Sequence, residues 1–382
     1  MTDKDHNPSS THPPLPPTPE DEQFSRLRLL RSRRVGISTY KRLLTEHGTA
    51  QNALAALPEV ARAAGVPDYR ICPEGVVLAE LKAARACGAQ LLFFDVPPYP
   101  ASLSDLPDAP PFLWTIGDTS LLSRPMISLV GARNASSLGT RMARALARDL
   151  GAAGYVVVSG LARGIDAAAH QAALETGTIA VQAGGVDVMY PAENTDLARQ
   201  IGETGLRLSE QPVGLQPMAR HFPGRNRIIS GLSRVTVVVE AAAKSGSLIT
   251  ARDALDQGRE VLAVPGHPFD ARAAGCNLLL RDGATLVRNA ADVLEALGPI
   301  APPEAQPPLP LAPPPHKDRR SLRETAALHS RILSRLGAAP LAEDQLIRDL
   351  QAPAAEVAPV LVDLELEGQI ARRPGGLLSK VV

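Results

Sequence analysis

The order of apolar and polar positions divides the chain into a helical part, a longer α/β part and a second helical part. From Phe24 to about Gly88, short amphipathic stretches are interrupted by Gly and Pro, which predicts a small helical domain. Between about 125 and 297, short apolar runs alternate with amphipathic stretches, as in a parallel sheet with crossover helices. The expected fold class is therefore α/β. Strands are expected at Met126–Val130, Tyr155–Ser159, Thr178–Gln182, Leu206–Ser209, Val235–Val239, Val261–Val264 and Thr285–Val287.

Two segments of the chain are rich in proline. Residues 1–20 hold six prolines and residues 299–315 hold nine, so a disordered tail and an extended spacer are expected there. After the spacer, three expected helices precede a hairpin that turns at Pro374-Gly375-Gly376, which predicts a winged helix. The expected domains are a disordered tail at 1–20, a helical SAM-like domain at 21–88, the α/β domain at 89–298, a proline-rich linker at 299–317 and the winged helix at 318–382.

The first helical domain contains a short motif with two interpretations. The segment from Arg34 to Gly48 resembles a helix-hairpin-helix or SAM-like unit, in which a Gly-centred turn can bring backbone amides near a phosphate. A helical bundle that only packs explains the same residues. The sequence is consistent with both interpretations.

Composition restricts the possible functions. Forty Lys and Arg balance forty Asp and Glu, so any binding of nucleic acid must depend on a local basic surface. Cys72, Cys87 and Cys276 are widely spaced without a Cys-x-x-Cys pair, which argues against a zinc site and a disulfide framework. No apolar run approaches the roughly 18 residues of a membrane span. A cytosolic protein that does not enter the membrane is expected.

Three Gly-rich turns follow expected strands at the edge where a parallel sheet binds its ligands. The first runs from Gly131 to Gly139, the second from Ser159 to His170, and the third from Lys244 to Thr250. Backbone amides in such turns can bind anions. The glycine spacing differs from the dinucleotide fingerprint, and Ser159 stands where an acidic residue would be required, so no nicotinamide cofactor is expected.

Asp166 and His170 share a helix face at i and i+4, which raises the question of a general base or a metal site. A helix-capping Asp bonded to a buried His explains both residues without catalysis, and we favour that interpretation. No metal and no catalytic residue are expected.

The most informative segment runs from Arg220 to Arg234 and contains four arginines and no acid. Guanidinium groups bind phosphates through paired hydrogen bonds, and the ring of Phe222 offers a face on which a base can stack. A surface loop whose arginines pair with distant acids is the alternative, although the absence of local acids counts against it. Replacing Arg225 and Arg227 together with Ala is expected to weaken DNA binding and to leave the fold intact.

The chain resembles the DNA-processing protein A (DprA/Smf) family from about Tyr99 to Val293. The motifs that carry the resemblance, in order, are Ser128 to Arg133, Ser159 to His170, Tyr190-Pro191, Ser209-Glu210, Phe222 to Ile229, Glu240 to Thr250 and Val264 to Gly266.

The resemblance implies an extended Rossmann-like core that forms a homodimer, binds single-stranded DNA in a basic pocket, protects it and loads the RecA recombinase during natural transformation. It implies no enzymatic turnover. The pocket implied by the family would use Arg133, Arg225, Arg227 and Lys244, with Phe222 beside them. Together with the turns described above, the residues expected to contact DNA are Gly131, Arg133, Ser159, Gly160, Arg220, Phe222, Arg225, Asn226, Arg227, Lys244, Ser245, Gly246 and Ser247.

Two other functions compete with DNA binding as explanations of these motifs. A lysine-decarboxylase-like nucleotide phosphoribohydrolase would share the Rossmann-like layout, but it needs a catalytic Glu near a Pro-Gly-Gly-x-Gly-Thr turn, and the turn from Lys244 to Thr250 contains no Glu. A purely structural scaffold leaves the convergence of Gly-rich turns and arginines unexplained.

In the winged helix, the helix expected over 354–367 carries four acids and no Lys or Arg, which favours protein contacts over DNA binding. Pro359 is expected to kink this helix or to delay its start. Duplex binding through the wing residues Arg372 and Arg373 remains the alternative.

Overall fold

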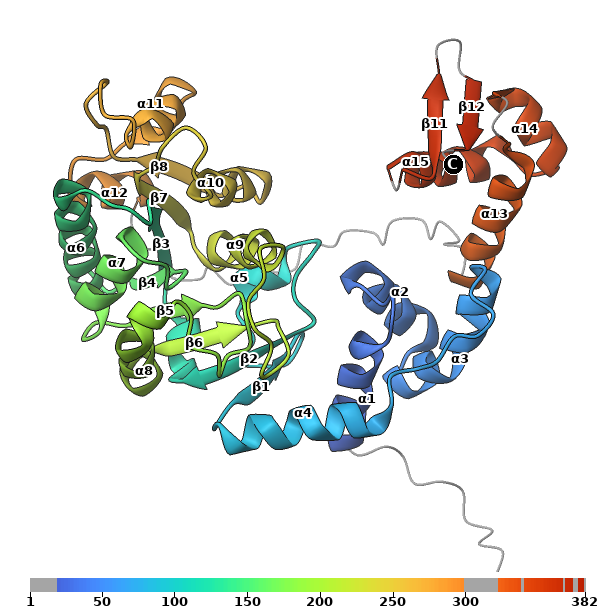
Figure 1. Ribbon diagram of the computed structural model, residues 1–382, viewed down its shortest axis with the longest axis horizontal. Helices are drawn as coiled ribbons and strands as arrows, with labels where there is room; N and C mark the ends of the chain where they lie inside the picture. Colours follow the sequence, from blue (N-terminus) through green and yellow to red (C-terminus); the bar gives the residue numbers. More distant parts are fainter. Residues whose placement is uncertain (1–18, 299–321, 338–339, 367, 374–376, 381–382) are drawn as a thin grey trace, which may run out of the picture. The chain divides into compact units, whose positions relative to one another are not determined.

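The computed structural model describes residues 19–298, 322–337, 340–366, 368–373 and 377–380. They belong to two compact units, one made of residues up to Val77 together with those after 312, and the other beginning at Leu78 (Figure 1). The expected tail up to residue 18, the proline-rich linker and the hairpin turn at 374–376 lie outside the described residues. In the described part of the chain, no helix is long and apolar enough to cross a membrane.

The described residues of the larger unit form a nine-stranded sheet in the order β1-β2-β6-β5-β4-β3-β7-β8-β9. All neighbouring pairs from β6 to β9 along this order are parallel, whereas β1 and β2 pair antiparallel at one edge. The strands are β1 (Gln90–Phe93), β2 (Phe112–Gly117), β3 (Met126–Gly131), β4 (Val156–Ser159), β5 (Thr178–Val181), β6 (Leu206–Ser209), β7 (Val235–Glu240), β8 (Glu260–Ala263) and β9 (Thr285–Leu286).

The seven strands expected from the sequence are all present, each within one residue of its expected bounds. Strands β3 to β7 are mostly apolar and almost wholly buried because both faces of the sheet are covered. In β3, Leu129 enters one core and Val130 enters the other. The strand β3 lies between β4 and β7, where the chain order along the sheet changes direction. Open α/β sheets bind ligands at this switch point, at the carboxyl ends of the strands.

Helices cover both faces of the sheet (Figure 1). One core contains residues of α5 (Ala101–Ser104), α9 (His221–Leu232), α10 (Ser247–Asp256) and α11 (Ala274–Arg281). The other contains residues of α6 (Ser137–Ala152), α7 (Ile165–Ala173) and α12 (Ala290–Leu297). The remaining elements are α8 (Thr195–Thr204) and the short 3₁₀ helices η1 (Thr119–Ser123) and η2 (Ala192–Asn194).

The smaller unit contains a helical domain and a winged helix, which confirms both expected classes. The first comprises α1 (Pro19–Arg31), α2 (Ile37–His47), α3 (Ala50–Ala63) and the start of α4 (Glu74–Ala86). The second comprises α13 (Leu322–Arg335), β10 (Leu341–Ala342), α14 (Glu343–Leu350), α15 (Ala354–Leu366), β11 (Ile370–Arg373) and β12 (Leu377–Lys380).

The third helix of the winged domain begins where the sequence predicted. Pro359 lies inside α15, which starts at Ala354, so this proline does not delay the start of the helix. Each domain of the smaller unit has its own buried core. The compact units divide inside α4, and the proposed domain boundaries at 88 and 298 remain predictions.

Candidate nucleic-acid interface

Two adjoining cavities lie at the carboxyl ends of the central strands. The inner cavity has a volume of about 400 Å³ and the outer one about 880 Å³. We call the two cavities together the groove. The residues that line both cavities are Arg133, Ala162, Tyr190, Pro217, Phe222 and Arg225.

The turn after β3 is held by Glu240, which ends the neighbouring strand β7. Ser136 is the N-cap of α6, and its hydroxyl accepts a hydrogen bond from the Gly139 amide at 2.9 Å. The Glu240 carboxylate accepts from the Ser136 amide at 2.9 Å and from its hydroxyl at 2.5 Å. A Cβ on Gly131 would lie 2.9 Å from the Glu240 carbonyl oxygen, so this position requires a glycine. The turn therefore presents Arg133 to the groove on a fixed backbone.

Asp166 and His170 hold the turn after β4, but not as the sequence interpretation supposed. The Asp166 carboxylate accepts from the amides of Gly160, at 3.1 Å, and Ala162, at 3.4 Å. His170 Nε2 accepts from the Leu161 amide at 3.3 Å, and Nδ1 lies 2.7 Å from the Thr178 hydroxyl. Each side chain thus binds the turn separately, which corrects the expectation that the Asp bonds to the His.

Burial determines the charge states of these two groups. It lowers the pKa of His170 to about 3, with a further contribution from the positive charge of Arg225. The ring is therefore neutral at physiological pH, and the Thr178 hydroxyl, which donates to the Val157 carbonyl, accepts from Nδ1. Burial raises the pKa of Asp166, while Arg225 and the turn amides oppose this rise. Both residues have structural partners that account for them without catalysis.

Arg225 lies in the wall between the groove and the sheet. Its side chain is buried, and Nη1 donates to the carbonyl of Gly160 and, at 2.5 Å, to that of Val181. Burial lowers the pKa of its guanidinium to about 10, which leaves it charged at physiological pH. A Cβ on Gly160 would collide with this guanidinium, so the glycine provides the space that Arg225 occupies. Arg225 therefore joins the ends of two strands as well as lining both cavities.

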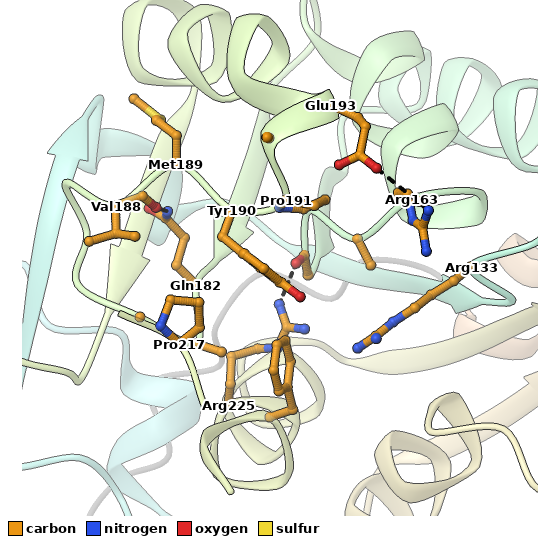
Figure 2. A pocket seen from close by; sticks show the side chains of 16 residues that line it. Arg133, Arg163, Gln182, Val188, Met189, Tyr190, Pro191, Glu193, Pro217 and Arg225 are labelled. Atoms are coloured by element: carbon orange, nitrogen blue, oxygen red, sulfur yellow. Dashed lines mark hydrogen bonds and ion pairs between the residues drawn. The ribbon is translucent and has the colours of Figure 1, made fainter. Parts of the chain in front are cut away.

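Phe222 links the cations of the groove to an aromatic surface. The Arg133 guanidinium carbon lies 5.1 Å from the centre of the Phe222 ring, and that of Arg225 lies at 5.8 Å. The Tyr190 ring lies 6.0 Å from the same ring and is tilted by 55°. Figure 2 shows Arg133, Arg225 and Tyr190 pointing toward one another in the cavity. Such a cluster can contact a phosphate and a base of one nucleotide.

Arg227 and Arg220 are not brought into the groove. Arg227 forms ion pairs with Glu210 at 2.5 Å and with Asp108 at 3.4 Å, and its Nη1 donates to the Asp108 carbonyl. Neither arginine lines either cavity. The structural partners of Arg225 and Arg227 also argue against the expectation that replacing both would leave the fold intact.

The turn after β7 faces the outer cavity. Lys244 is exposed there, and the hydroxyls of Ser245 and Ser247 lie 2.7 Å apart. The side-chain amide of Asn226 donates through Nδ2 to the Gly246 carbonyl at 3.4 Å, which ties α9 to this turn. Helix α10 begins at Ser247, which lines the outer cavity, so the N-terminus of α10 adds a partial positive charge to this cavity.

The structure adds residues to the expected set and leaves one of that set inside the core. Ser159 is fully buried, and its hydroxyl donates to the Leu129 carbonyl at 2.6 Å. Arg163 and Tyr190 belong to motifs already noted, but only the folded structure shows that they line the groove. Arg272 gave no signal in the sequence. The charged groups that line the groove are the cations Arg133, Arg163, Arg225, Lys244 and Arg272 and the carboxylates Asp166 and Glu193.

Models of three protein families match the chain in sequence. Residues 90–298 match the DNA recombination-mediator protein A family. Residues 20–83 match the DprA-like N-terminal HHH domain, and residues 301–376 match the DprA winged helix domain.

Curated relatives agree with these matches. The DNA processing protein DprA of Streptococcus pneumoniae is 46% identical over 198 residues, which cover 51% of this chain and 70% of the relative. That of Bacillus subtilis is 43% identical over 220 residues, covering 57% and 74%. The protein Smf of Synechocystis is 35% identical over 320 residues, covering 75% and 79%.

Two solved structures are similar in fold. The crystal structure of DprA from Streptococcus pneumoniae superposes with a TM-score of 0.55 at 34% identity and covers 68% of this chain and 98% of its own. A structure of DprA from Helicobacter pylori, described by its single-stranded DNA binding mode, gives a TM-score of 0.51 at 31% identity and covers 55% and 95%. The chain therefore belongs to the DNA recombination-mediator protein A (DprA/Smf) family.

Proposed function

We propose that this chain binds single-stranded DNA in the groove, protects it, and delivers it to a RecA recombinase during natural transformation. The observation that carries the proposal is the meeting of Arg133, Phe222 and Lys244 with Gly-rich turns at the switch point of the sheet. Phosphates suit the cations and the backbone amides of the turns. A base can stack beside the Tyr190 and Phe222 rings, which line both cavities next to these cations.

The groove favours binding over hydrolysis. Of the two carboxylates that line it, Asp166 is buried and bonded to backbone amides, and Glu193, in the protein without ligand, lies 3.5 Å from Arg163 in an exposed ion pair. Glu240, at the end of β7, is bonded to Ser136. A hydrolase needs a carboxylate free to position water beside a sugar. We therefore propose that the protein acts by binding. Membership of the DprA/Smf family supports the further proposal that it does so in the cytoplasm as a homodimer.

The test pairs a binding assay with an activity assay. Wild-type protein is titrated into a fluorescein-labelled thymine oligonucleotide, and the same preparation is incubated with nucleoside monophosphates to detect release of free base. Binding without base release is expected. Base release without binding to the oligonucleotide would refute the proposal in favour of a nucleotide phosphoribohydrolase.

Delivery to a recombinase requires a separate measurement. RecA filament formation is followed on an oligonucleotide covered with a single-strand-binding protein, with and without this chain. The chain should shorten the delay before filaments grow. An unchanged delay, at concentrations that saturate the oligonucleotide, would limit the function to DNA binding.

A further inference from the structure

We propose that Arg163 is a further DNA-binding residue, held by Glu193 until a strand arrives, and that its guanidinium then exchanges this carboxylate for a DNA phosphate. Arg163 lies outside the set of residues that the sequence indicated. The inference rests on the proposed function, because the incoming ligand is a phosphate of the bound single strand.

The backbones of the two residues are fixed relative to each other. Arg163 follows β4 in the turn that Asp166 and His170 hold through backbone amides. Glu193 lies in η2, and the side chain of its neighbour Asn194 donates to the Leu161 carbonyl at 2.9 Å. The turn and η2 are therefore tied together, and only the side chains of Arg163 and Glu193 need to move in an exchange.

The side chains form a weak pair at the groove. Arg163 Nη1 lies 3.5 Å from Glu193 Oε1, and both side chains are 60% exposed. Both residues line the inner cavity, and Figure 2 shows the pair there together with Arg133. An exposed pair at this distance contributes little to stability, because water screens it and two long side chains must be held in place.

A phosphate is the stronger partner for this arginine. A guanidinium binds phosphate oxygens through two parallel hydrogen bonds, whereas the Glu193 contact is a single long one. Arg133 lines the inner cavity together with Arg163, so a DNA strand bound to Arg133 brings the negative charge of its phosphates into the cavity that holds Arg163. Asp166, the other carboxylate of the groove, is buried and bonded to amides, so Glu193 is the acid that competes.

The exchange lowers the affinity of the groove without removing its preference for phosphate. Binding must break the pair before Arg163 contributes, and release re-forms it. A protein that passes its strand to another protein benefits from such an internal competitor, because the competitor assists dissociation. Glu193 is thus expected to weaken binding, although it touches no part of the strand.

The experiment is a thermodynamic cycle on the full chain. Affinity for a 20-nucleotide thymine oligonucleotide is measured by fluorescence anisotropy at 0.15 M salt for wild type, R163A, E193Q and the double variant. R163A should weaken binding about tenfold, the loss expected for one charge-assisted contact. The slope of log affinity against log salt should become shallower by about 0.7. E193Q should strengthen binding about threefold, and this gain should disappear in the R163A background.

A matched pair controls for charge alone. Arg199 and Asp196 on α8 form an exposed pair at 2.9 Å, and neither residue lines the groove. R199A and D196N should leave the affinity unchanged. The arginine variants are compared by circular dichroism, and R163K, which retains the charge, should recover part of the lost affinity if the fold is intact.

The outcomes separate this inference from the function on which it rests. An equal gain from E193Q with and without Arg163 would show that Glu193 only repels phosphates, and it would overturn the exchange. An unchanged affinity and salt slope in R163A would do the same. Failure of the wild-type chain to bind the oligonucleotide at all would refute the proposed function, and this inference with it.

Discussion

Replacing Arg225 with Ala should destabilise the DNA-binding unit, whereas replacing Arg133 with Ala should remove a DNA contact from an intact unit. Both arginines lie near the Phe222 ring and line both cavities. They differ in burial: Arg225 is 6% exposed and bonded to two carbonyls, while Arg133 is exposed to solvent. Comparing the two variants therefore distinguishes Arg225, whose role is structural, from Arg133, whose guanidinium is available to a phosphate.

The expected losses of stability follow from these contacts. Hydrogen bonds to a charged group contribute about 1.5–3 kcal/mol each, so losing both carbonyl contacts in R225A should cost about 3–6 kcal/mol. In a unit of this size, about 1 kcal/mol shifts Tm by about 2–4 °C, so Tm should fall by at least about 6 °C. R133A loses only an exposed cation–π contact, worth about 0.5–1 kcal/mol.

The assay combines thermal unfolding, followed by circular dichroism, with oligonucleotide binding below the transition. R133A should unfold within about 4 °C of wild type and bind more weakly, with a shallower salt dependence. R225A should unfold at clearly lower temperature. A stable R225A protein with only its DNA affinity reduced would refute the structural role assigned to the two carbonyl contacts.

Three further predictions concern the strand, the C-terminal domain and pH. The chain should bind a thymine single strand more tightly than a matched duplex at the same salt, with slight sequence preference, because turns lined with glycine suit a flexible strand; equal affinities would count against the groove. Deleting residues 318–382 should leave this affinity within about threefold, since α15 carries Glu356 and Asp363 and Arg372 is paired with Glu343 and Glu365. A larger loss, or micromolar or tighter binding of a duplex by the isolated domain that disappears when Arg372 and Arg373 are replaced, would reverse that assignment. Burial lowers the pKa of His170 from 6.5 to about 3, so below pH 6.5 the unfolded chain binds a proton at this residue that the folded chain does not bind. The free energy of unfolding should therefore fall as the pH drops below 6.5. At pH 5 the free energy of unfolding should be about 2 kcal/mol lower because of His170, and H170Q should lack this part of the pH dependence in urea titrations.

The sequence was sufficient to predict the parallel part of the sheet and the edge at which the groove lies. Seven apolar runs predicted seven strands, and the three Gly-rich turns do meet at their carboxyl ends. The antiparallel strands β1 and β2 were missed. Strand β2 directly follows Pro110 and Pro111, which made the segment resemble a loop.

The arginine-rich segment shows where sequence reasoning reached its limit. Residues 221–232 form α9, in which Pro223 is tolerated because it lies in the first turn. Arg225 and Arg227 are two residues apart, so they point to nearly opposite sides of this helix. Glu210 and Asp108, which pair with Arg227, come from distant parts of the chain. The absence of acids within the segment was therefore a poor guide to the partners of its arginines.

The dependence of single-strand affinity on salt tests the central claim most directly. Three of the cations that line the groove are exposed: Arg133, Arg163 and Lys244. Among the described residues, Arg133 and Lys244 have no close carboxylate partner, and Arg163 has only the 3.5 Å contact with Glu193. Three phosphates at about 0.7 each predict a slope of log affinity against log salt of about −2 for wild type. The double variant R133A/K244A should retain a slope of about −0.7. The same slope in wild type and in the folded double variant would contradict binding of the strand in this groove.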